Sequence, residues 1–193
     1  MLKQRASRYG SGRTRDAGTG WKCKTKPMSV DAVLVYAQAG HGHRASVQTD
    51  YTFAVWSRPP ADAAKAAAAL EAFARREAPP VSGGDAVSGT LQLVTFAKAY
   101  LGLRDAEFKA VDRVIRATTV NQFGPVRSLR PTLVFETGLK GNGASPRHKS
   151  GVAVRCPRML RLRPDKPLHE ADTLAAPRAL AAGAALSAGP APA

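Results

Sequence analysis

The residues of this chain that could do chemistry are mostly cations, and most of the excess positive charge lies in two segments. Residues 147–166 (RHKSGVAVRCPRMLRLRPDK) contain seven Lys or Arg and one acid, a net charge of +6. Residues 1–26 contain eight Lys or Arg and one acid, so the two segments supply 13 of the formal +15. Clustered cations favour a polyanionic partner through Coulomb attraction and counterion release, whereas evenly spread charge would indicate a solvated surface. The sequence therefore predicts phosphate binding.

Four of these cations are spaced so that pairs of them could hold one phosphate. Lys22 and Lys24 are two residues apart, so on a strand both ammonium groups would project from one face. Arg161 and Arg163 would share a strand face in the same way, and a guanidinium fork suits phosphate oxygens that gain charge as a phosphoryl bond breaks. Asp165 is expected to orient its basic neighbours rather than to act as a base.

Five further residues of the second segment are candidates for contact with a nucleic-acid backbone. Arg147, His148 and Lys149 precede Ser150 and could contact DNA phosphates, but a plain basic turn describes them equally well. For Arg155 and Arg158, a solvated strand face or a DNA backbone contact is about as good an interpretation as a nucleotide contact.

Other polar and aromatic residues favour structural roles. His41 and His43 have no Cys or carboxylate nearby at metal-ligand spacing, so they are interpreted as turn residues and no metal site is predicted. Tyr51 and Phe53 share a strand face, where core packing is expected rather than base stacking. Glu136 is interpreted as a structural partner for an arginine.

Length and composition set the broad class. A chain of 193 residues can form one core of ordinary size with some extensions. Cys23 and Cys156 are far apart and form no CxxC motif, which favours a reduced, cytoplasmic setting. The sequence has no apolar run near the roughly 20 residues that cross a bilayer, so no membrane partner is expected.

The order of expected elements favours a mainly β fold. Alternating and β-branched residues predict five strands, and helical periodicity predicts a helix between the third and fourth of them. An Ala-rich segment between proline pairs predicts an inserted helix, and an Ala/Pro-rich tail is expected to be disordered. The expected strands are 30–39, 45–57, 90–100, 132–138 and 151–163, the helices are 105–118 and 61–78, and the tail is 175–193. This order is typical of a five-stranded OB-fold barrel, although other small barrels and sandwiches stay open.

Three motifs add a family resemblance. The segment RCPRMLRLRPDK resembles the C-terminal motif of ATP-dependent DNA ligases, in which Arg-Phe-Pro-Arg is followed by Arg-x-Asp-Lys. The segment GWKCKTKP resembles the nucleotidyltransferase motif with two alternating lysines, and the initial MLK resembles the end of a further ligase motif. From Met1 to about Leu174, apart from the inserted helix, the chain resembles the C-terminal region of a bacterial ATP-dependent DNA ligase.

The resemblance implies a domain organisation and a set of roles. Residues 1–28 would be the remnant of a nucleotidyltransferase domain, and residues 29–174 would be the OB-fold domain. The nucleotide-binding residues would contact the α-phosphate of ATP or the adenylate (Lys3, Lys22 and Lys24) and its β- and γ-phosphates (Arg163 and Lys166). ATP and Mg²⁺ would be the cofactors of the complete enzyme. Nicked double-stranded DNA would be the partner, in repair-type sealing at the bacterial nucleoid.

The sequence also departs from a complete ligase of this kind. The lysine nucleophile of these enzymes lies in a Lys-x-Asp-Gly motif, and this sequence contains no Asp-Gly dipeptide. We therefore expect no catalytic residue in this chain and no self-adenylation, and a separately encoded nucleotidyltransferase domain is a candidate partner. The alternatives are a stand-alone, non-catalytic OB-fold DNA-binding protein and a degenerate product that folds poorly. Cys23 and Cys156 stand where the family has larger side chains.

Overall fold

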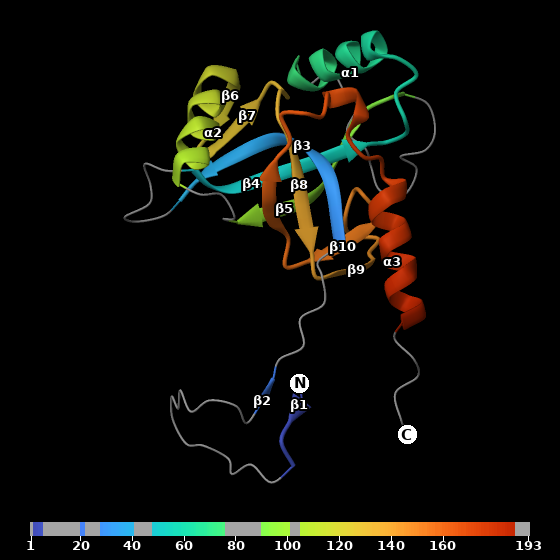
Figure 1. Cartoon of the computed structure of the whole chain (residues 1–193). Coiled ribbons are helices and arrows are strands. Elements are labelled where there is room, and N and C mark those ends of the chain that lie inside the picture. Colours follow the sequence, from blue (N-terminus) through green and yellow to red (C-terminus); the bar gives the residue numbers. More distant parts are fainter. Residues whose placement is uncertain are drawn as a thin grey trace.

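An antiparallel sheet forms the centre of the molecule. The computed structural model describes residues 2–5, 20–21, 28–40, 48–75, 90–100 and 105–187. The main path of the sheet runs in the order β11-β8-β3-β4-β5 (Figure 1). Its strands are β3 (Met28–Ala39), β4 (Gln48–Trp56), β5 (Leu93–Tyr100), β8 (Val134–Leu139) and β11 (Arg158–Leu162). Strand β3 is central because it pairs with β4 on one side and with β8 on the other.

Shorter elements surround this sheet. A hairpin of β6 and β7 pairs with β3 through β7, while β9 with β10 and β1 with β2 form separate two-stranded sheets. These strands are β1 (Leu2–Lys3), β2 (Gly20–Trp21), β6 (Thr119–Phe123), β7 (Val126–Leu129), β9 (Gly141–Ala144) and β10 (Val152–Arg155). The helices are α1 (Ala63–Arg75), α2 (Asp105–Thr118), the 3₁₀ turn η2 (Leu168–Glu170) and α3 (Ala175–Ser187). None of the helices in the described ranges is long and apolar enough to cross a membrane.

The apolar residues form two clusters, one on each face of β3. Leu34 packs in the cluster that contains Ile115 of α2, whereas Val33 packs in the cluster that lies beneath α1. Burial on both faces explains why the middle of β3 is continuously apolar instead of alternating. In the cluster beneath α1, the fully buried Trp56 donates its indole N–H to the carbonyl oxygen of Leu168, at 2.8 Å.

The mainly β, antiparallel fold expected from the sequence is confirmed. The first two expected strands correspond to β3 and β4, which pair with each other in antiparallel fashion. Along the chain, α2 lies between β5 and β8. The closed five-stranded barrel is not confirmed, because β11 and β5 are the two ends of the sheet path and no ladder joins them in the described ranges. The mainly β expectation therefore holds, and the five-stranded OB-fold is not confirmed.

The expected single strand over residues 151–163 is wrong. This segment forms two strands, β10 and β11, which belong to different sheets. The break falls at Cys156, whose φ of 49° lies in the left-handed region, and at Pro157, which has no N–H to donate to a ladder. The cations of the segment are consequently divided between two strands.

The expected disorder of the tail is wrong for residues 175–187. These residues form α3, because their Ala and Leu content favours a helix and because the helix is held in place. Leu180 packs against the core, and the Asn142 side-chain amide donates to the carbonyl oxygen of Pro177 at 2.6 Å. Helix α3 thereby lies beside the β9–β10 hairpin (Figure 1).

Candidate phosphate-binding surfaces

The loop that joins β9 to β10, residues 145–151, carries three of the expected DNA-binding residues. Its backbone is closed by two hydrogen bonds: the Ser145 N–H donates to Gly151 O at 2.9 Å, and the Gly151 N–H donates to His148 O at 2.8 Å. Ser150 is fully buried, and its hydroxyl oxygen accepts the Val152 N–H at 3.3 Å. We call residues 145–151 the basic loop. These hydrogen bonds within the loop fix the course of its backbone.

Helix α3 braces the basic loop from outside. The Arg178 Nε–H donates to the carbonyl oxygen of Ser150 at 3.2 Å. The next residue, Gly151, has a φ of 73°, and a Cβ there would lie 3.4 Å from an Arg178 guanidinium nitrogen. Glycine is favoured at this point by the positive φ, whereas a Cβ at 3.4 Å from the arginine would be in ordinary contact with it. The tail that was expected to be disordered therefore helps to fix the loop.

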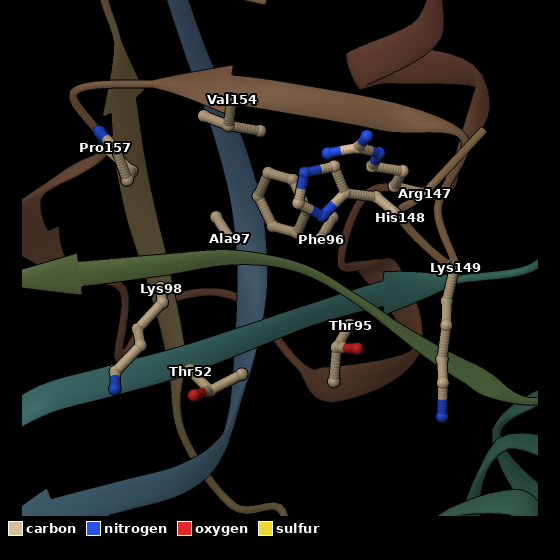
Figure 2. Close-up of a pocket in the computed structure, with 10 residues that line it drawn as sticks. All are labelled: Thr52, Thr95, Phe96, Ala97, Lys98, Arg147, His148, Lys149, Val154 and Pro157. Atoms are coloured by element: carbon tan, nitrogen blue, oxygen red, sulfur yellow. The ribbon is translucent and has the colours of Figure 1, made fainter. Parts of the chain in front are cut away.

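A groove of about 460 Å³ lies between the basic loop and the end strand β5 (Figure 2). Arg147, His148 and Lys149 contribute one wall, and Thr95 and Lys98 of β5 contribute to the other. The remaining lining residues are Thr52, Phe96, Ala97, Val154 and Pro157. The groove thus combines an apolar floor with hydroxyl groups and several cations.

The cations around the groove differ in how far they are neutralised. Lys98 donates to the Gln38 side-chain oxygen at 2.7 Å, and its Nζ lies 3.5 Å from an Asp50 carboxylate oxygen. The two loop cations Arg147 and Lys149 are exposed, and within the described ranges neither forms an ion pair. The loop therefore presents positive charge that no described carboxylate compensates.

Arg155 and Arg158 lie on either side of the Cys156–Pro157 break. Both side chains are exposed, and neither makes an ion pair with any residue that the structure describes. Pro157 lines the groove, so the two arginines flank a groove residue along the chain. The structure thus brings four of the expected DNA-binding residues, together with His148, to the region of the β10–β11 corner and the basic loop.

Arg163 and Lys166 form a second cationic site, but carboxylates already hold it. The Arg163 Nη1–H donates to both Asp31 oxygens, at 3.0 and 3.2 Å, and the Lys166 ammonium donates to Asp31 Oδ2 at 2.7 Å. Arg163 also contacts Asp165, with Nη2 2.9 Å from Oδ2. Asp165 orients its basic neighbour, as the sequence suggested. We call Asp31, Arg163, Asp165 and Lys166 the ionic cluster.

The ionic cluster continues across the sheet. Asp31 of β3 lies opposite Glu136 of β8 in the strand register, and like charges in that arrangement destabilise a sheet unless cations compensate them. Arg161 supplies one such cation, because its Nε–H donates to Glu136 Oε2 at 2.6 Å. This contact confirms the expected structural role of Glu136, and it lowers the pKa of that carboxyl.

We expect the Asp165 contact to add a pH dependence to stability. The hydrogen bond from Arg163 lowers the pKa of Asp165 below its ordinary value, so its stabilisation is present above about pH 3.9 and is lost as pH falls through the folded-state pKa. In urea titrations between pH 2 and 6, the Asp165→Asn variant should lose stability less steeply than the unmodified chain below about pH 4. Equal slopes for the two chains would contradict this prediction.

The other residues considered in the sequence analysis include three expected phosphate-binding lysines and four residues interpreted as turn or core residues. Lys22, Lys24, His41 and His43 lie outside the described residues, and for Lys3 only the backbone, in β1, is described. Tyr51 and Phe53 are fully buried, which confirms core packing. Burial raises the pKa of Tyr51, whose hydroxyl donates to the carbonyl oxygen of Gln48 at 2.9 Å.

Sequence reasoning missed two residues of these surfaces, Asp31 and Lys98. Asp31 is more than 130 positions from its partners, and only the register of β3, β8 and β11 brings them together. Lys98 fits the alternating pattern of its strand, and this pattern does not indicate that a groove lies beside the strand. Within the described ranges, no group of three or more His, Cys, Asp or Glu is placed to hold a metal ion.

The described part of the chain is thus a mainly β domain with two cationic surfaces, the basic loop with its groove and the ionic cluster. No model of a known protein family matches the chain. A probable DNA ligase of Koribacter versatilis is 35% identical over 175 residues, which are 90% of this chain and 24% of that protein. A probable DNA ligase of Opitutus terrae is 34% identical over 185 residues, 95% of this chain and 15% of that protein.

The chain is therefore related to DNA ligases, and it spans about a quarter or less of the length of the curated relatives it matches. The resemblance to the C-terminal region of bacterial ATP-dependent DNA ligases is confirmed. A DNA ligase of Korarchaeum cryptofilum is 28% identical over 157 residues. Among solved structures, the ligase domain of LigD from M. tuberculosis aligns with 74% of this chain and 37% of that chain, with a TM-score of 0.44 and 15% identity.

Proposed function

We propose that this chain is the β-domain portion of an ATP-dependent DNA ligase, and that it binds nicked double-stranded DNA through the basic loop. The observation that carries the proposal is the braced loop itself. Arg147 and Lys149 are exposed and without a described carboxylate partner, on a backbone that hydrogen bonds and Arg178 hold in place. A prearranged cationic loop suits the regularly spaced phosphates of a duplex.

The groove beside the loop supports the same role. Lys98, Thr52 and Thr95 line it opposite the loop, and hydroxyl and ammonium groups are common donors to phosphate and sugar oxygens. Arg155 and Arg158 would extend the contact along the β10–β11 corner. The proposed DNA surface therefore consists of the basic loop, which includes His148, the groove and this corner.

The second part of the proposal concerns the nucleotide. Arg163 and Lys166 would approach the β- and γ-phosphates of ATP during adenylation, as the ligase resemblance implies. Lys3, Lys22 and Lys24 would contact the α-phosphate, from the proposed nucleotidyltransferase remnant at residues 1–28. The OB-type domain would then span residues 29–174, with α1 as an insertion and α3 as an addition that braces the basic loop.

The cofactors of the proposed reaction are ATP and Mg²⁺. The described residues offer no cluster of metal ligands, so they do not fit a resident Mg²⁺ site, and we assign no step to the metal here. The nucleotidyltransferase domain of a ligase would form the adenylate on its lysine nucleophile. The proposed setting is nick sealing in DNA repair in the bacterial cytoplasm, at the nucleoid.

Duplex binding in a salt series tests the DNA part of the proposal. The double variant Arg147→Ala/Lys149→Ala should bind a nicked duplex at least about ten-fold more weakly at low salt than the unmodified chain. Its slope of log affinity against log salt should be shallower by about 1.8, because two phosphate contacts are lost. Fluorescence anisotropy with a labelled nicked duplex measures both quantities.

A double variant of matched charge gives the control. Lys65→Ala/Arg75→Ala removes two cations from α1, which contributes no residue to the groove lining, and should change the slope by less than half as much. Equal losses in the two double variants would show that net charge, rather than the basic loop, governs binding. Sealing of a nick by the chain only when a ligase nucleotidyltransferase domain is added would favour the ligase role over a stand-alone DNA-binding protein.

A further inference from the structure

Asp31 is paired with Arg163 and Lys166, the two cations that the proposed function assigns to nucleotide phosphates. Three donor contacts converge on its carboxylate: two from the Arg163 guanidinium and one from the Lys166 ammonium. The side chains are largely shielded from water, with 13% exposure for Asp31 and 19% for each cation. In this arrangement neither cation has its charge free for a ligand.

The backbone around Asp31 keeps its carboxylate in this position. The Asp31 N–H donates to Asp172 Oδ2 at 2.8 Å, and the Asp172 N–H donates in return to the Asp31 carbonyl oxygen at 2.8 Å. Asp31 also lies in the middle of the β3–β8 ladder, between paired residues on both sides. Arg163 directly follows β11, and its N–H donates to the carbonyl oxygen of Val134 at 2.9 Å. Lys166 lies in the turn that follows, in which its N–H donates to Arg163 O at 3.2 Å. The backbones of Asp31 and Arg163 are therefore both held to the sheet, so an exchange of partners would be a movement of the Arg163 and Lys166 side chains.

The charge balance at the site opposes an incoming anion. Two cations face three nearby carboxylates, since Asp165 contacts Arg163 and Asp172 lies 4.0 Å from the Lys166 ammonium. A phosphate chain that approached the paired cations would meet a net negative environment. Phosphate and Asp31 are also alternative acceptors for the same N–H donors, because each guanidinium or ammonium hydrogen is directed at one acceptor.

We propose that Asp31 is an intramolecular competitor of polyphosphate, which holds Arg163 and Lys166 until a phosphate chain displaces it. This inference rests on the proposed nucleotide role of the two cations and adds the residue that regulates it. The chain thus has two exclusive states. In one the cations pair with Asp31, and in the other their side chains turn away from Asp31 and bind the phosphates.

The test compares Asp31→Asn with the unmodified chain for binding of inorganic tripolyphosphate. Asparagine keeps the shape of the side chain and its acceptor oxygen but removes the competing charge. We expect Asp31→Asn to bind tripolyphosphate at least about ten-fold more tightly in isothermal titration calorimetry at fixed ionic strength. Equal or weaker binding by a folded Asp31→Asn chain would overturn the inference.

Asp62→Asn is the matched control. It makes the same chemical change and the same change in net charge, but on the solvent-exposed residue that caps α1, where the Lys65 N–H donates to Asp62 Oδ1 at 2.7 Å. Asn caps a helix about as well as Asp, so the fold should be retained. We expect tripolyphosphate affinity to change less than two-fold, and a gain as large as that of Asp31→Asn would overturn the inference.

Two more measurements separate the possible failures. If Arg163→Gln/Lys166→Gln binds tripolyphosphate as well as the unmodified chain, the proposed nucleotide role fails. If that double variant loses binding but Asp31→Asn gains none, only the competition fails. Should Asp31→Asn not fold, the ¹³C resonance of the Asp31 carboxylate is followed in the unmodified chain: saturating tripolyphosphate should shift it, and an unchanged resonance overturns the inference.

Discussion

Replacement of Phe53 by alanine is expected to lower the free energy of unfolding by about 3–5 kcal/mol. The ring is fully buried in the larger cluster, where it meets the Phe135 ring edge-on with centroids 5.5 Å apart. Phe53 lies on β4 and Phe135 lies on β8, and β3 lies between these two strands in the sheet. A cavity at this contact would therefore weaken the packing of three strands. Urea denaturation at neutral pH measures the effect.

Phe73→Ala provides the comparison. Phe73 lies on α1 and is only partly buried, packing against Tyr36 with ring centroids 6.0 Å apart. The same chemical change should cost less than half as much there, since less area is removed from water. A Phe53→Ala cost below about 1 kcal/mol, or one no larger than that of Phe73→Ala, would show that Phe53 is not packed in the core as described.

Replacement of Gly151 by valine is expected to destabilise the chain by about 1–3 kcal/mol and to lower duplex affinity. Its φ of 73° is a conformation that a β-branched residue rarely adopts, and the new Cβ would meet the Arg178 guanidinium that braces the basic loop. Loss of that brace should also loosen Arg147 and Lys149. Urea denaturation and anisotropy with a nicked duplex measure the two effects.

Gly143→Val, in the same β9–β10 hairpin, is the matched control. A Cβ at Gly143 would have no described heavy atom within 4 Å, and a β-branched residue suits a strand. We expect a change in stability within about 0.5 kcal/mol and unaltered duplex affinity. If the two glycine variants behaved alike, neither the positive φ nor the Arg178 contact would matter to the loop.

Much of the fold was predictable because its signals are local. The alternation in β5 and the apolar face of α2 determine these elements from their own residues, and α2 has the bounds that the sequence indicated. The division of residues 151–163 into two strands was not predictable in this way. It depends on the positive φ of Cys156, and a cysteine in the sequence does not predict a positive φ. Helix α3 was missed because its stability comes partly from contacts with β9 and Ser150.

In the candidate surfaces too, features set by the local sequence were predictable, and features that depend on tertiary contacts were not. Cations were found from the sequence because clustered charge is visible without a structure, and Arg147 and Lys149 do lie together on one loop. Their partners were not found, because pairing depends on strand register. In the sequence, Asp31 is an isolated acid in an apolar strand. In the structure, it accepts hydrogen bonds from Arg163 and Lys166, the two cations of the ligase-like motif.

The missing ladder between β5 and the strands at the other end of the sheet has a mechanical consequence. The groove is lined by β5 on one side and by the basic loop, Val154 and Pro157 on the other, and no ladder hydrogen bond between described strands crosses it. Its width can change when side chains shift, while every backbone hydrogen bond of the sheet stays intact. In the proposed complex with DNA, the two sides of the groove could therefore adapt to duplexes of different local shape without loss of a ladder hydrogen bond.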